Sequence, residues 1–377
     1  MKKKIVTVVG TRPEIIRLSS IINKLDKNFN HILVNTNQNF DKNLNRVFFE
    51  NFNLKIPKYN MKNNEKSPIK FIGKTFDYIN QILINEKPDA FLVLGDTNSS
   101  LSCYVAKKNN IPIFHIEAGN RSFDPRVPEE INRKLVDHLS DFNICYSENS
   151  RQNLISEGFT YEKVFVSGSP LKEVFIKSQK LIQNSKILNK LKISKRNFFL
   201  ISIHRDENVK DIDNLKKVFD YISKISKKNK LKSVITLHPK TKDKLSKNYK
   251  YILKDKNLIF QLPFDFKDYC MLQKHSKFVI SDSGSISEES YIQDFPAINI
   301  RDSHERSEAM DNGTVVMSGF SPEGLKGAIN ILVNQKFLGP QSRKINIPFY
   351  NELNVSDKIV TILISYINYA KKRKWFN

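Results

Sequence analysis

Short apolar segments of strand length alternate with amphipathic segments of helix length from the first residues of this chain almost to its end. The apolar runs are nearly continuous, as in buried parallel strands, and such strands need a crossover of a dozen or more residues between neighbours. This alternation predicts a doubly wound α/β domain. Its strands are expected at residues 5–10, 31–36, 90–95, 111–116, 142–147 and 164–168, with helices at 13–25, 69–84 and 129–139.

A second series of the same kind follows a lysine-rich helical connector at residues 171–195. Because 377 residues exceed one ordinary core, the sequence predicts two Rossmann-like domains, at 1–169 and 170–355. The last helical segment, 356–377, is expected to pack back on the first domain. A cleft between the two domains is the expected ligand site. The strands of the second series are expected at 197–204, 233–238, 258–263, 278–284, 296–300 and 314–319.

The net charge of +23 comes mostly from lysines scattered over the whole chain. The basic stretches at 224–230 and 371–374 lack interleaved stacking aromatics, so we expect no nucleic-acid partner. No apolar run approaches the roughly 18 residues that span a bilayer, so no membrane insertion is expected. The N-terminus passes from Met-Lys-Lys-Lys straight into a strand without a cleavage site, which predicts a cytoplasmic protein.

The cysteines and histidines do not indicate a metal centre. Cys103, Cys145 and Cys270 are isolated in apolar surroundings, which predicts buried free thiols. No pair of histidines has the spacing of metal ligands, so no catalytic metal is expected.

Three carboxylates occupy positions that indicate chemistry. Asp96 and Glu117 each follow an apolar run that predicts a buried strand, and Glu129 opens the next helix. In open α/β sheets ligands bind outside the carboxyl ends of the strands, so acidic groups there face a crevice. We therefore expect Asp96 and Glu117 to be neighbours. Clustered carboxylates raise one another's pKa, which would let one of them hold a proton near neutrality.

Two segments have the pattern of anion-binding turns. After the first strand comes Gly10-Thr11-Arg12-Pro13, where proline starts a helix and Arg12 can contact a phosphate or carboxylate. After a strand of the second series comes Ser281 to Glu289, in which Ser283, Gly284 and Ser285 precede a helix. Glu289, further along that helix, suits a ribose diol, although a plain capping box would use the same residue types.

His204 follows another expected strand of the second series and stands beside Arg205. A lone histidine is usually structural, but its place at a strand end makes an active role equally plausible.

The chain resembles the non-hydrolysing UDP-N-acetylglucosamine 2-epimerase family in seven motifs that follow one another in order. The resemblance implies two Rossmann-like domains in a GT-B-type arrangement with the active site in the interdomain cleft, a homodimer, a UDP-sugar substrate and no cofactor or metal. The motifs are GTRPE at Gly10, GDTNS at Gly95, EAGNR at Glu117, PEEINR at Pro128, HRDEN at His204, SDSGSISEE at Ser281 and HER at His304.

Several of these motifs depart from the commonest family pattern and look like the branch that makes UDP-N-acetyl-L-fucosamine. Members of that branch invert C2 of UDP-2-acetamido-2,6-dideoxy-β-L-talose on the way to a capsule or O-antigen precursor. The variants are GDTNS, EAGNR, Gly168-Ser169-Pro170 and SGSISEE, together with RVPEE at Arg126 and SHERSE at Ser303.

The resemblance also implies a mechanism, since the C2 hydrogen is not adjacent to a ring carbonyl. UDP leaves C1 as the C2 proton is removed, giving a 2-acetamidoglycal, and UDP returns as a proton reaches the other face. The implied acid and base groups are Asp96, Glu117 and Glu129, with His204 beside the diphosphate. The implied nucleotide-binding or ordering residues are Arg12, Arg133, Ser283, Gly284, Ser285, Glu289 and Arg306.

Other interpretations share parts of this pattern. The same machinery would interconvert UDP-N-acetylglucosamine and UDP-N-acetylmannosamine, and a hydrolysing epimerase would let water capture the intermediate. A GT-B glycosyltransferase would share the fold but need an acceptor. Spacing alone would make Glu129 and Arg133 a solvated pair one helical turn apart.

Overall fold

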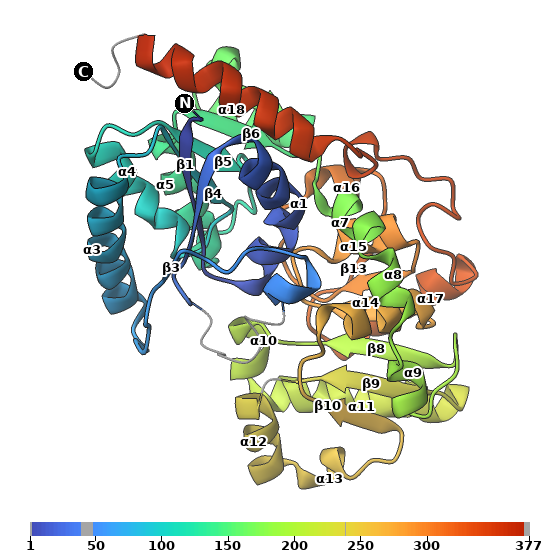
Figure 1. Cartoon of the computed structure of the whole chain (residues 1–377). Helices are drawn as coiled ribbons and strands as arrows, with labels where there is room; N and C mark the ends of the chain where they lie inside the picture. Colours follow the sequence, from blue (N-terminus) through green and yellow to red (C-terminus); the bar gives the residue numbers. More distant parts are fainter. Residues whose placement is uncertain (1, 39–47, 238, 373–377) are drawn as a thin grey trace. The chain divides into compact units, whose positions relative to one another are not determined.

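The computed structural model describes residues 2–38, 48–237 and 239–372 and divides into two compact units. Unit 1 comprises Met1–Lys177 and Pro348–Asn377, and unit 2 comprises Ser178–Ile347. The return to unit 1 begins before the last helix, because the Ser169 N–H donates to the Phe349 carbonyl across 2.8 Å. Both units are parallel-sheet α/β domains, so the predicted fold class is confirmed (Figure 1).

The sheet of unit 1 has seven parallel strands in the order β3-β2-β1-β4-β5-β6-β7. Its central strands are fully buried, as their uninterrupted apolar sequences predict. The edge strand β3 was not predicted, since it has only two residues and pairs on one side with β2. The strands are β1 (Lys4–Val9), β2 (Asn30–Asn35), β3 (Tyr59–Asn60), β4 (Ala90–Leu94), β5 (Ile113–Ile116), β6 (Phe142–Cys145) and β7 (Val164–Val166).

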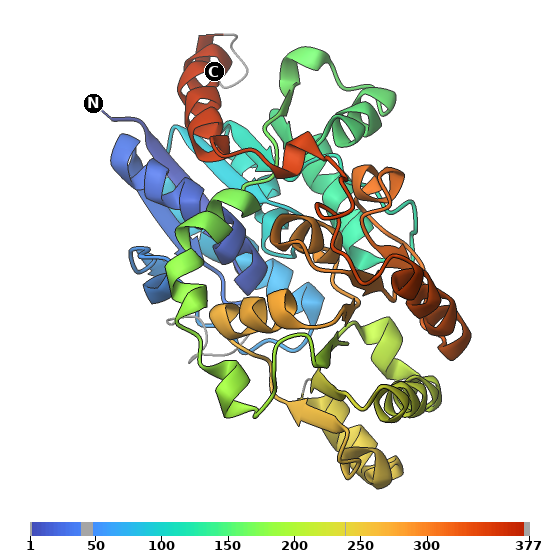
Figure 2. The ribbon, with the colours of Figure 1, turned by 90° about the vertical axis from the view of Figure 1, so that its right-hand side faces the viewer.

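Helices cover both faces of this sheet. Helix α1 packs against α7 and α18, while α3 and α5 each pack against α4 (Figure 1 and Figure 2). Lys24 of α1 donates to Asp357 of α18 across 2.7 Å, so the last helix belongs to this unit. The helices are α1 (Arg12–Asn28), α3 (Pro68–Glu86), α4 (Cys103–Lys108), α5 (Pro128–Leu139), α6 (Glu148–Ser156), α7 (Leu171–Lys177) and α18 (Val355–Lys372), with 3-10 turns at Ser100–Ser102, Tyr161–Lys163 and Pro348–Tyr350.

The sheet of unit 2 has six parallel strands in the order β10-β9-β8-β11-β12-β13. All six fall inside the strands predicted for the second series, apart from the first residue of β9, and β13 is shorter than predicted because it pairs only with β12. The strands are β8 (Phe198–Ser202), β9 (Lys232–Thr236), β10 (Leu258–Gln261), β11 (Val279–Ser281), β12 (Ala297–Asn299) and β13 (Val316–Met317).

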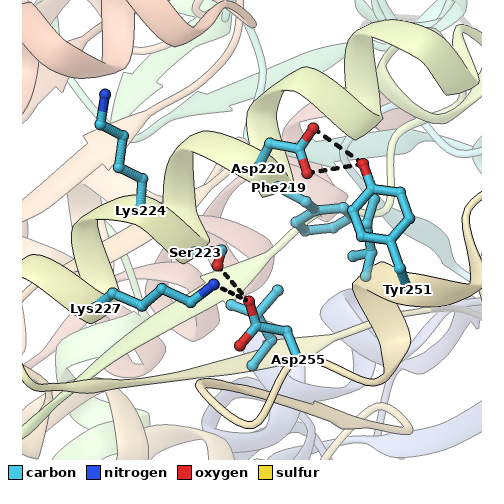
Figure 3. Close-up of a pocket in the computed structure, with 9 residues that line it drawn as sticks. Phe219, Asp220, Ser223, Lys224, Lys227, Tyr251 and Asp255 are labelled. Carbon is cyan, nitrogen blue, oxygen red and sulfur yellow. Dashed lines mark hydrogen bonds and ion pairs between the residues drawn. The ribbon is translucent and has the colours of Figure 1, made fainter.

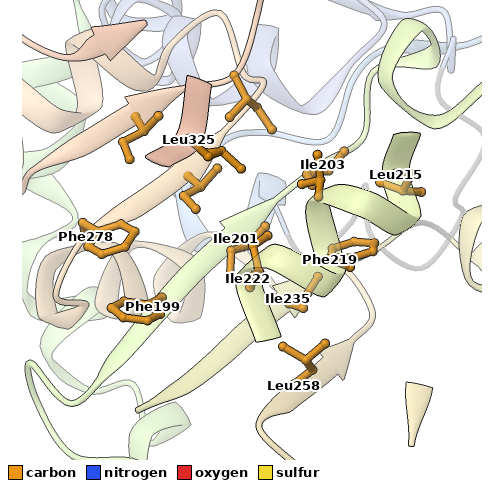
Figure 4. Packing of buried hydrophobic residues seen from close by; sticks show 14 of the residues in the cluster. Phe199, Ile201, Ile203, Leu215, Phe219, Ile222, Ile235, Leu258, Phe278 and Leu325 are labelled. Atoms are coloured by element: carbon orange, nitrogen blue, oxygen red, sulfur yellow. The ribbon is translucent and has the colours of Figure 1, made fainter. Parts of the chain in front are cut away.

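Helix α11 shows how sequence builds the core of unit 2. The Asp211 carboxylate caps its first turn by accepting from two backbone N–H groups. Its apolar residues at helical spacing, Leu215, Phe219 and Ile222, pack on the sheet beside Leu325 of α17 (Figure 4). The helices are α8 (Gln179–Gln183), α9 (Ile187–Lys190), α10 (Asp206–Lys210), α11 (Ile212–Asn229), α12 (Pro239–Asn248), α13 (Lys250–Leu253), α14 (Phe266–His275), α15 (Ile286–Gln293), α16 (Ser307–Asp311) and α17 (Pro322–Asn334).

Strand order reverses once in each sheet, and these switch points locate the site residues. In unit 1 the reversal lies between β1 and β4, and in unit 2 between β8 and β11. Loops leaving two strands at such a point diverge to opposite faces, which opens a crevice at the carboxyl ends. The segments after these four strands contain Arg12, Asp96, His204 and Ser283.

Cys103, Cys145 and Cys270 are buried free thiols, as predicted, and burial raises the pKa of Cys103 to about 12.

Within the described ranges, no helix is both long and apolar enough to cross a bilayer.

Candidate active site

Arg133 joins the two strand-end carboxylates of unit 1. It lies in α5 with its side chain only 2% exposed, and its Nη2 donates to Asp96 Oδ2. The same nitrogen lies 3.5 Å from Glu117 Oε1, and Nη1 donates to the Glu117 carbonyl across 2.6 Å. The predicted proximity of Asp96 and Glu117 is therefore present, with one buried guanidinium between them.

Glu117 also has an unusual backbone. Its φ of 66° lies in the left-handed region, where a residue with a side chain is strained by about 1–3 kcal/mol. Gly119, two residues later, has φ 76°, and a Cβ there would lie 2.2 Å from the Ser150 carbonyl oxygen. Strain held by surrounding structure is common at functional sites, so the conformation supports a role for this carboxylate.

Arg17 is a site residue that the sequence analysis missed. Its Nη1 lies 3.4 Å from Glu117 Oε2, and its guanidinium carbon lies 5.8 Å from the centre of the Tyr146 ring. The side chain is 7% exposed. The only sequence signal was a charged residue on the apolar face of α1, between Ile15 and Leu18.

Glu14 connects the loops after β1 and β4 and was also missed. Its Oε2 accepts from the N–H groups of Gly10 (3.0 Å) and Thr11 (2.7 Å) and from the Thr11 hydroxyl (2.8 Å). Its Oε1 accepts from the Thr97 hydroxyl across 2.9 Å. Burial raises the pKa of Glu14 to about 7, although these hydrogen bonds oppose the rise. Glu14 therefore positions the backbone beside both Arg12 and Asp96.

Gly10 is required where these loops meet. A Cβ at this position would lie 2.0 Å from Ser99 Oγ and 2.4 Å from Thr36 Oγ1. Those two hydroxyls are 2.7 Å apart, so the ends of β1, β2 and the loop after β4 touch without space for a side chain.

A buried charge network lies beneath the two carboxylates. Asp137 accepts from His115 Nδ1 (2.8 Å) and Arg121 Nη1 (2.7 Å), and His115 Nε2 lies 2.8 Å from the Gly95 carbonyl oxygen. Burial alone would raise the pKa of Asp137, but His115 and Arg121 hold it below its ordinary value. The network fixes the backbone next to Asp96, which gives His115 a structural role.

Glu129 and Arg12 stand at the starts of two helices of unit 1. Glu129 lies half-buried in the first turn of α5, one helical turn before Arg133. Arg12 is the first residue of α1, and its guanidinium carbon lies 6.0 Å from the centre of the Phe48 ring. Both side chains remain partly accessible to a ligand.

The serine-rich turn of unit 2 forms a continuous chain of hydrogen bonds. The hydroxyls of Ser283 and Ser285 lie 2.9 Å apart, and Ser285 donates to Glu289 Oε1 across 2.6 Å. Gln273 of α14 donates to Glu289 Oε2, also across 2.6 Å. The turn stands at the start of α15, and the positive end of a helix favours an anion, although the N–H groups of Ser283, Ser285 and Ile286 already donate to serine oxygens.

Arginines surround Gly284 in the same turn. Arg306 Nε donates to the Gly284 carbonyl across 3.2 Å, and Arg306 Nη2 lies 3.4 Å from Glu288 Oε2. A Cβ on Gly284 would lie 3.3 Å from Arg301 Nη1. The structure therefore brings Arg306 to the predicted phosphate cradle and adds Arg301, which the sequence analysis did not single out.

His204 follows β8 and contacts Asp282, which follows β11. Its Nδ1 lies 2.8 Å from Asp282 Oδ1, and the imidazole is 54% exposed whereas the carboxylate is fully buried. Asp282 was missed because the segment around it was interpreted through its serines.

A surface pocket in unit 2 has a different character (Figure 3). It lies against α11, α13 and the first residue of β10, and so at the amino ends of the strands. Its carboxylates already have partners, since Asp220 accepts from Tyr251 and Asp255 accepts from Ser223. Ligands of open α/β sheets bind at the opposite ends, so we do not assign the active site here. The lining residues are Phe219, Asp220, Ser223, Lys224, Lys227, Tyr251, Ile252, Asp255 and Leu258.

No cluster of three or more potential metal ligands occurs among the residues that the structure describes. Unit 1 instead brings together carboxylates and arginines, which can move protons, and unit 2 brings together hydroxyls, arginines and one histidine, which can bind a diphosphate.

Known proteins resemble this chain along nearly its whole length. A family model described as UDP-N-acetylglucosamine 2-epimerase matches residues 23–364. The structure of UDP-N-acetylglucosamine 2-epimerase from Rickettsia bellii superposes with a TM-score of 0.91, is 41% identical and covers 100% of both chains. The Methanocaldococcus jannaschii UDP-GlcNAc 2-epimerase, solved in complex with UDP-GlcNAc and UDP, has a TM-score of 0.87 and 34% identity, covering 96% of this chain and 99% of that one.

A relative with another sugar in its name is also similar. The UDP-2,3-diacetamido-2,3-dideoxy-D-glucuronate 2-epimerase of Pseudomonas aeruginosa is 30% identical over 322 residues, which are 84% of this chain and 88% of that protein.

Glu14 should make stability depend on pH. Its folded pKa of about 7 exceeds the ordinary 4.5, so its contribution is fully present below about pH 4.5 and is lost as pH rises through 7. Glu14→Gln should remove this loss, because glutamine can accept from Gly10 and Thr11 while donating to Thr97. As pH rises from roughly 4.5 to 8.5, the free energy of unfolding of the variant should increase by about 3 kcal/mol relative to that of the wild type. Urea unfolding at each pH measures this difference.

Asp77→Asn, on the exposed face of α3, is the matched control and should leave the pH profile unchanged. Parallel profiles for wild type and Glu14→Gln would contradict the raised pKa.

Proposed function

Because the chain belongs to the UDP-N-acetylglucosamine 2-epimerase family, we propose that it inverts C2 of a UDP-linked 2-acetamido sugar by eliminating and re-adding UDP. UDP-sugar 2-epimerases are isomerases. The observation that carries the proposal is the pair Asp96 and Glu117, held at adjacent strand ends by the buried Arg133.

The chemistry explains why such a pair is needed. Direct removal of the C2 proton would leave a carbanion without a neighbouring carbonyl to stabilise it. When the C1–O bond to UDP breaks at the same time, the electron pair of the C2–H bond forms a C1=C2 double bond and the base keeps the proton. The products of this step are a 2-acetamidoglycal and UDP, which both stay bound. Re-addition of UDP to C1, with proton delivery to the opposite face of C2, completes the inversion.

Unit 1 supplies the groups for proton transfer. We propose that Asp96, Glu117 and Glu129 remove the C2 proton and deliver its replacement. Arg133 and Arg17 compensate the charge of the carboxylates and keep their oxygens in place. Arg12, at the start of α1, is a phosphate contact in this scheme, since the positive end of a helix and a guanidinium both favour an anion.

Unit 2 supplies the groups for UDP. The hydroxyls of Ser283 and Ser285 and the backbone at Gly284 form the diphosphate cradle, which Arg306 orders through the Gly284 carbonyl. Glu289 is assigned to the ribose hydroxyls. His204 donates to the departing diphosphate. Positive and dipolar groups around the leaving phosphate lower the barrier because charge develops there.

For the sugar, we propose UDP-2-acetamido-2,6-dideoxy-β-L-talose, which would give UDP-N-acetyl-L-fucosamine. The motif variants GDTNS, EAGNR and SGSISEE support this choice. UDP-N-acetylglucosamine is the second candidate, since it appears in the names of the relatives from Rickettsia bellii and Methanocaldococcus jannaschii. Arg121, the last residue of EAGNR, is fully buried against Asp137 and Glu157. This departure from the common family motif therefore affects the fold of the site and does not contact the sugar directly.

Both candidates can be offered separately to the purified chain in deuterated water, with product C2 configuration read by NMR. We expect the L-talose derivative to convert and its product to carry deuterium at C2. Turnover of UDP-N-acetylglucosamine alone would select the second candidate. Free UDP accumulating in step with turnover would indicate a hydrolysing epimerase, and activity only with an acceptor would indicate a glycosyltransferase. Inversion without deuterium at C2 would exclude the elimination route.

Removing either strand-end charge should stop the reaction without unfolding the chain. Asp96→Asn and Glu117→Gln keep the shape of each side chain but cannot accept a proton. We expect kcat to fall by roughly 10²- to 10⁴-fold, the usual contribution of a general acid or base, with UDP affinity by calorimetry retained. Asp77→Asn is again the control. Wild-type turnover in either variant would remove that residue from the proposed mechanism.

We also propose that two copies pair through an apolar helix surface formed by Tyr104 of α4 with Ile131 and Leu135 of α5. These side chains are 46–53% exposed. Two nearby lysines have acidic partners, since Lys107 pairs with Asp141 and Lys134 lies 3.3 Å from Glu130. Two copies of a chain with net charge +23 repel one another over most of their surface. They can therefore associate where exposed apolar side chains stand beside lysines that are paired with carboxylates.

Ile131→Asp with Leu135→Asp should therefore convert a dimer to a monomer in analytical ultracentrifugation, because each change buries a charge in the contact. Ile364→Asp, on an exposed position of α18, should leave the mass unchanged. A monomeric wild type, or a dimer that survives the double change, would refute this surface.

A further inference from the structure

Asp282 lies next to His204 and has the surroundings of a group that orients it. The two residues follow β8 and β11, which pair directly through Ser202 and Ser281. His204 Nδ1 lies 2.8 Å from Asp282 Oδ1. The carboxylate has no exposed surface, whereas the imidazole is 54% exposed. The ring therefore has one nitrogen anchored inside the protein while much of its surface faces solvent.

The carboxylate cannot rotate freely. Its Oδ2 accepts from the N–H groups of His204 (2.9 Å) and Arg205 (2.9 Å) and from Asn208 Nδ2 (3.1 Å). Oδ1 faces the ring and also accepts from the His204 N–H across 3.2 Å, so this N–H is shared between the two carboxylate oxygens. Although burial alone would raise it, the pKa of Asp282 is held below its ordinary value by His204 and by the backbone N–H groups. Asp282 is therefore an anion facing Nδ1.

We propose that Asp282 is a positioning residue that keeps hydrogen on His204 Nδ1 and lets the ring bind the UDP diphosphate as an imidazolium through Nε2. This inference rests on the proposed function only for the identity of the ligand. An acceptor on Nδ1 permits protonation of both nitrogens, and a charged donor makes a stronger hydrogen bond to phosphate than a neutral one. His204 stands near the cradle, because Arg205 Nη2, one residue on, lies 3.8 Å from the Cβ position of Gly284.

Two arginines near this pair both contact Glu305, a carboxylate other than Asp282. Arg205 Nη2 lies 3.9 Å from Glu305 Oε1, and Arg301 Nη1 lies 3.0 Å from the same oxygen. Glu305 therefore pairs with both arginines. The charge on Asp282 remains directed at His204 and the backbone around it.

Asp282→Asn provides a nearly isosteric test. The amide oxygen can replace Oδ2 and keep its three donors, which directs the amide NH₂ at His204 Nδ1. The ring must then accept at Nδ1 and hold its hydrogen on Nε2, as a neutral imidazole. Long-range ¹H–¹⁵N NMR of His204, assigned by comparison with His204→Gln, should show hydrogen on Nδ1 in the wild type and its loss from Nδ1 in Asp282→Asn.

The effect of Asp282→Asn on UDP binding and turnover should depend on His204. We expect Asp282→Asn to lower UDP affinity and kcat by roughly 10- to 100-fold. Combining it with His204→Gln should add little to the loss from His204→Gln alone, because the two changes remove one function. Asp255→Asn, which alters a hydrogen-bonded carboxylate in the pocket of Figure 3, should stay near wild type.

Several outcomes would overturn the proposal. A wild-type ring with hydrogen on Nε2 alone would do so, and this measurement needs no variant to fold. Losses that multiply in the double variant would show that Asp282 acts independently of His204. If the NMR and UDP-affinity results hold but no UDP-sugar is epimerised, the proposed function fails while the role of Asp282 stands.

Discussion

Parallel strand pairing is the constraint on which the rest of this structure depends. Because β1 pairs with both β2 and β4 in the same direction, the loops after Val9, Asn35 and Leu94 leave the sheet at one edge. The same holds in unit 2 for the segments after Ser202 and Ser281. Strand order reverses between β1 and β4 and between β8 and β11, so the segments that leave these strands run to opposite faces of each sheet. Carboxylates, serines and a histidine separated widely in sequence thereby become neighbours within each unit.

Buried carboxylates hold these loops in place. Glu14, Asp137 and Asp282 are each at most 1% exposed, and each accepts several hydrogen bonds that tie two segments of the chain together. A buried charge costs several kcal/mol unless partners surround it, so each of these groups is stable only when its loops keep one arrangement. The residues that would contact substrate, Asp96, Glu117 and His204, stand directly beside these anchors. Their geometry is set before any ligand binds.

Lysine and arginine side chains lie in different parts of this structure. No lysine is among the buried residues that the structure describes, although lysine supplies most of the positive charge of the chain. The buried cations are arginines, because a planar guanidinium forms several directed hydrogen bonds and is less strongly hydrated than an ammonium group. They are Arg17, Arg121, Arg133, Arg301 and Arg306. In a lysine-rich sequence, arginine is therefore a signal of site structure that could have identified Arg17 and Arg301.

The amino-acid sequence was sufficient to predict the alternation of strands and helices, the two parallel sheets and the strand ends that precede Asp96, Glu117 and His204. These follow from local patterns, since burial of short apolar runs and helical periodicity depend on neighbours along the chain. Which donors reach which carboxylates depends on how distant segments of the chain pack together. Thr97 meets Glu14 across 83 residues, and Asp282 meets His204 across 78. No local pattern encodes such pairs, because sheet pairing brings them together and burial then sets their charge states.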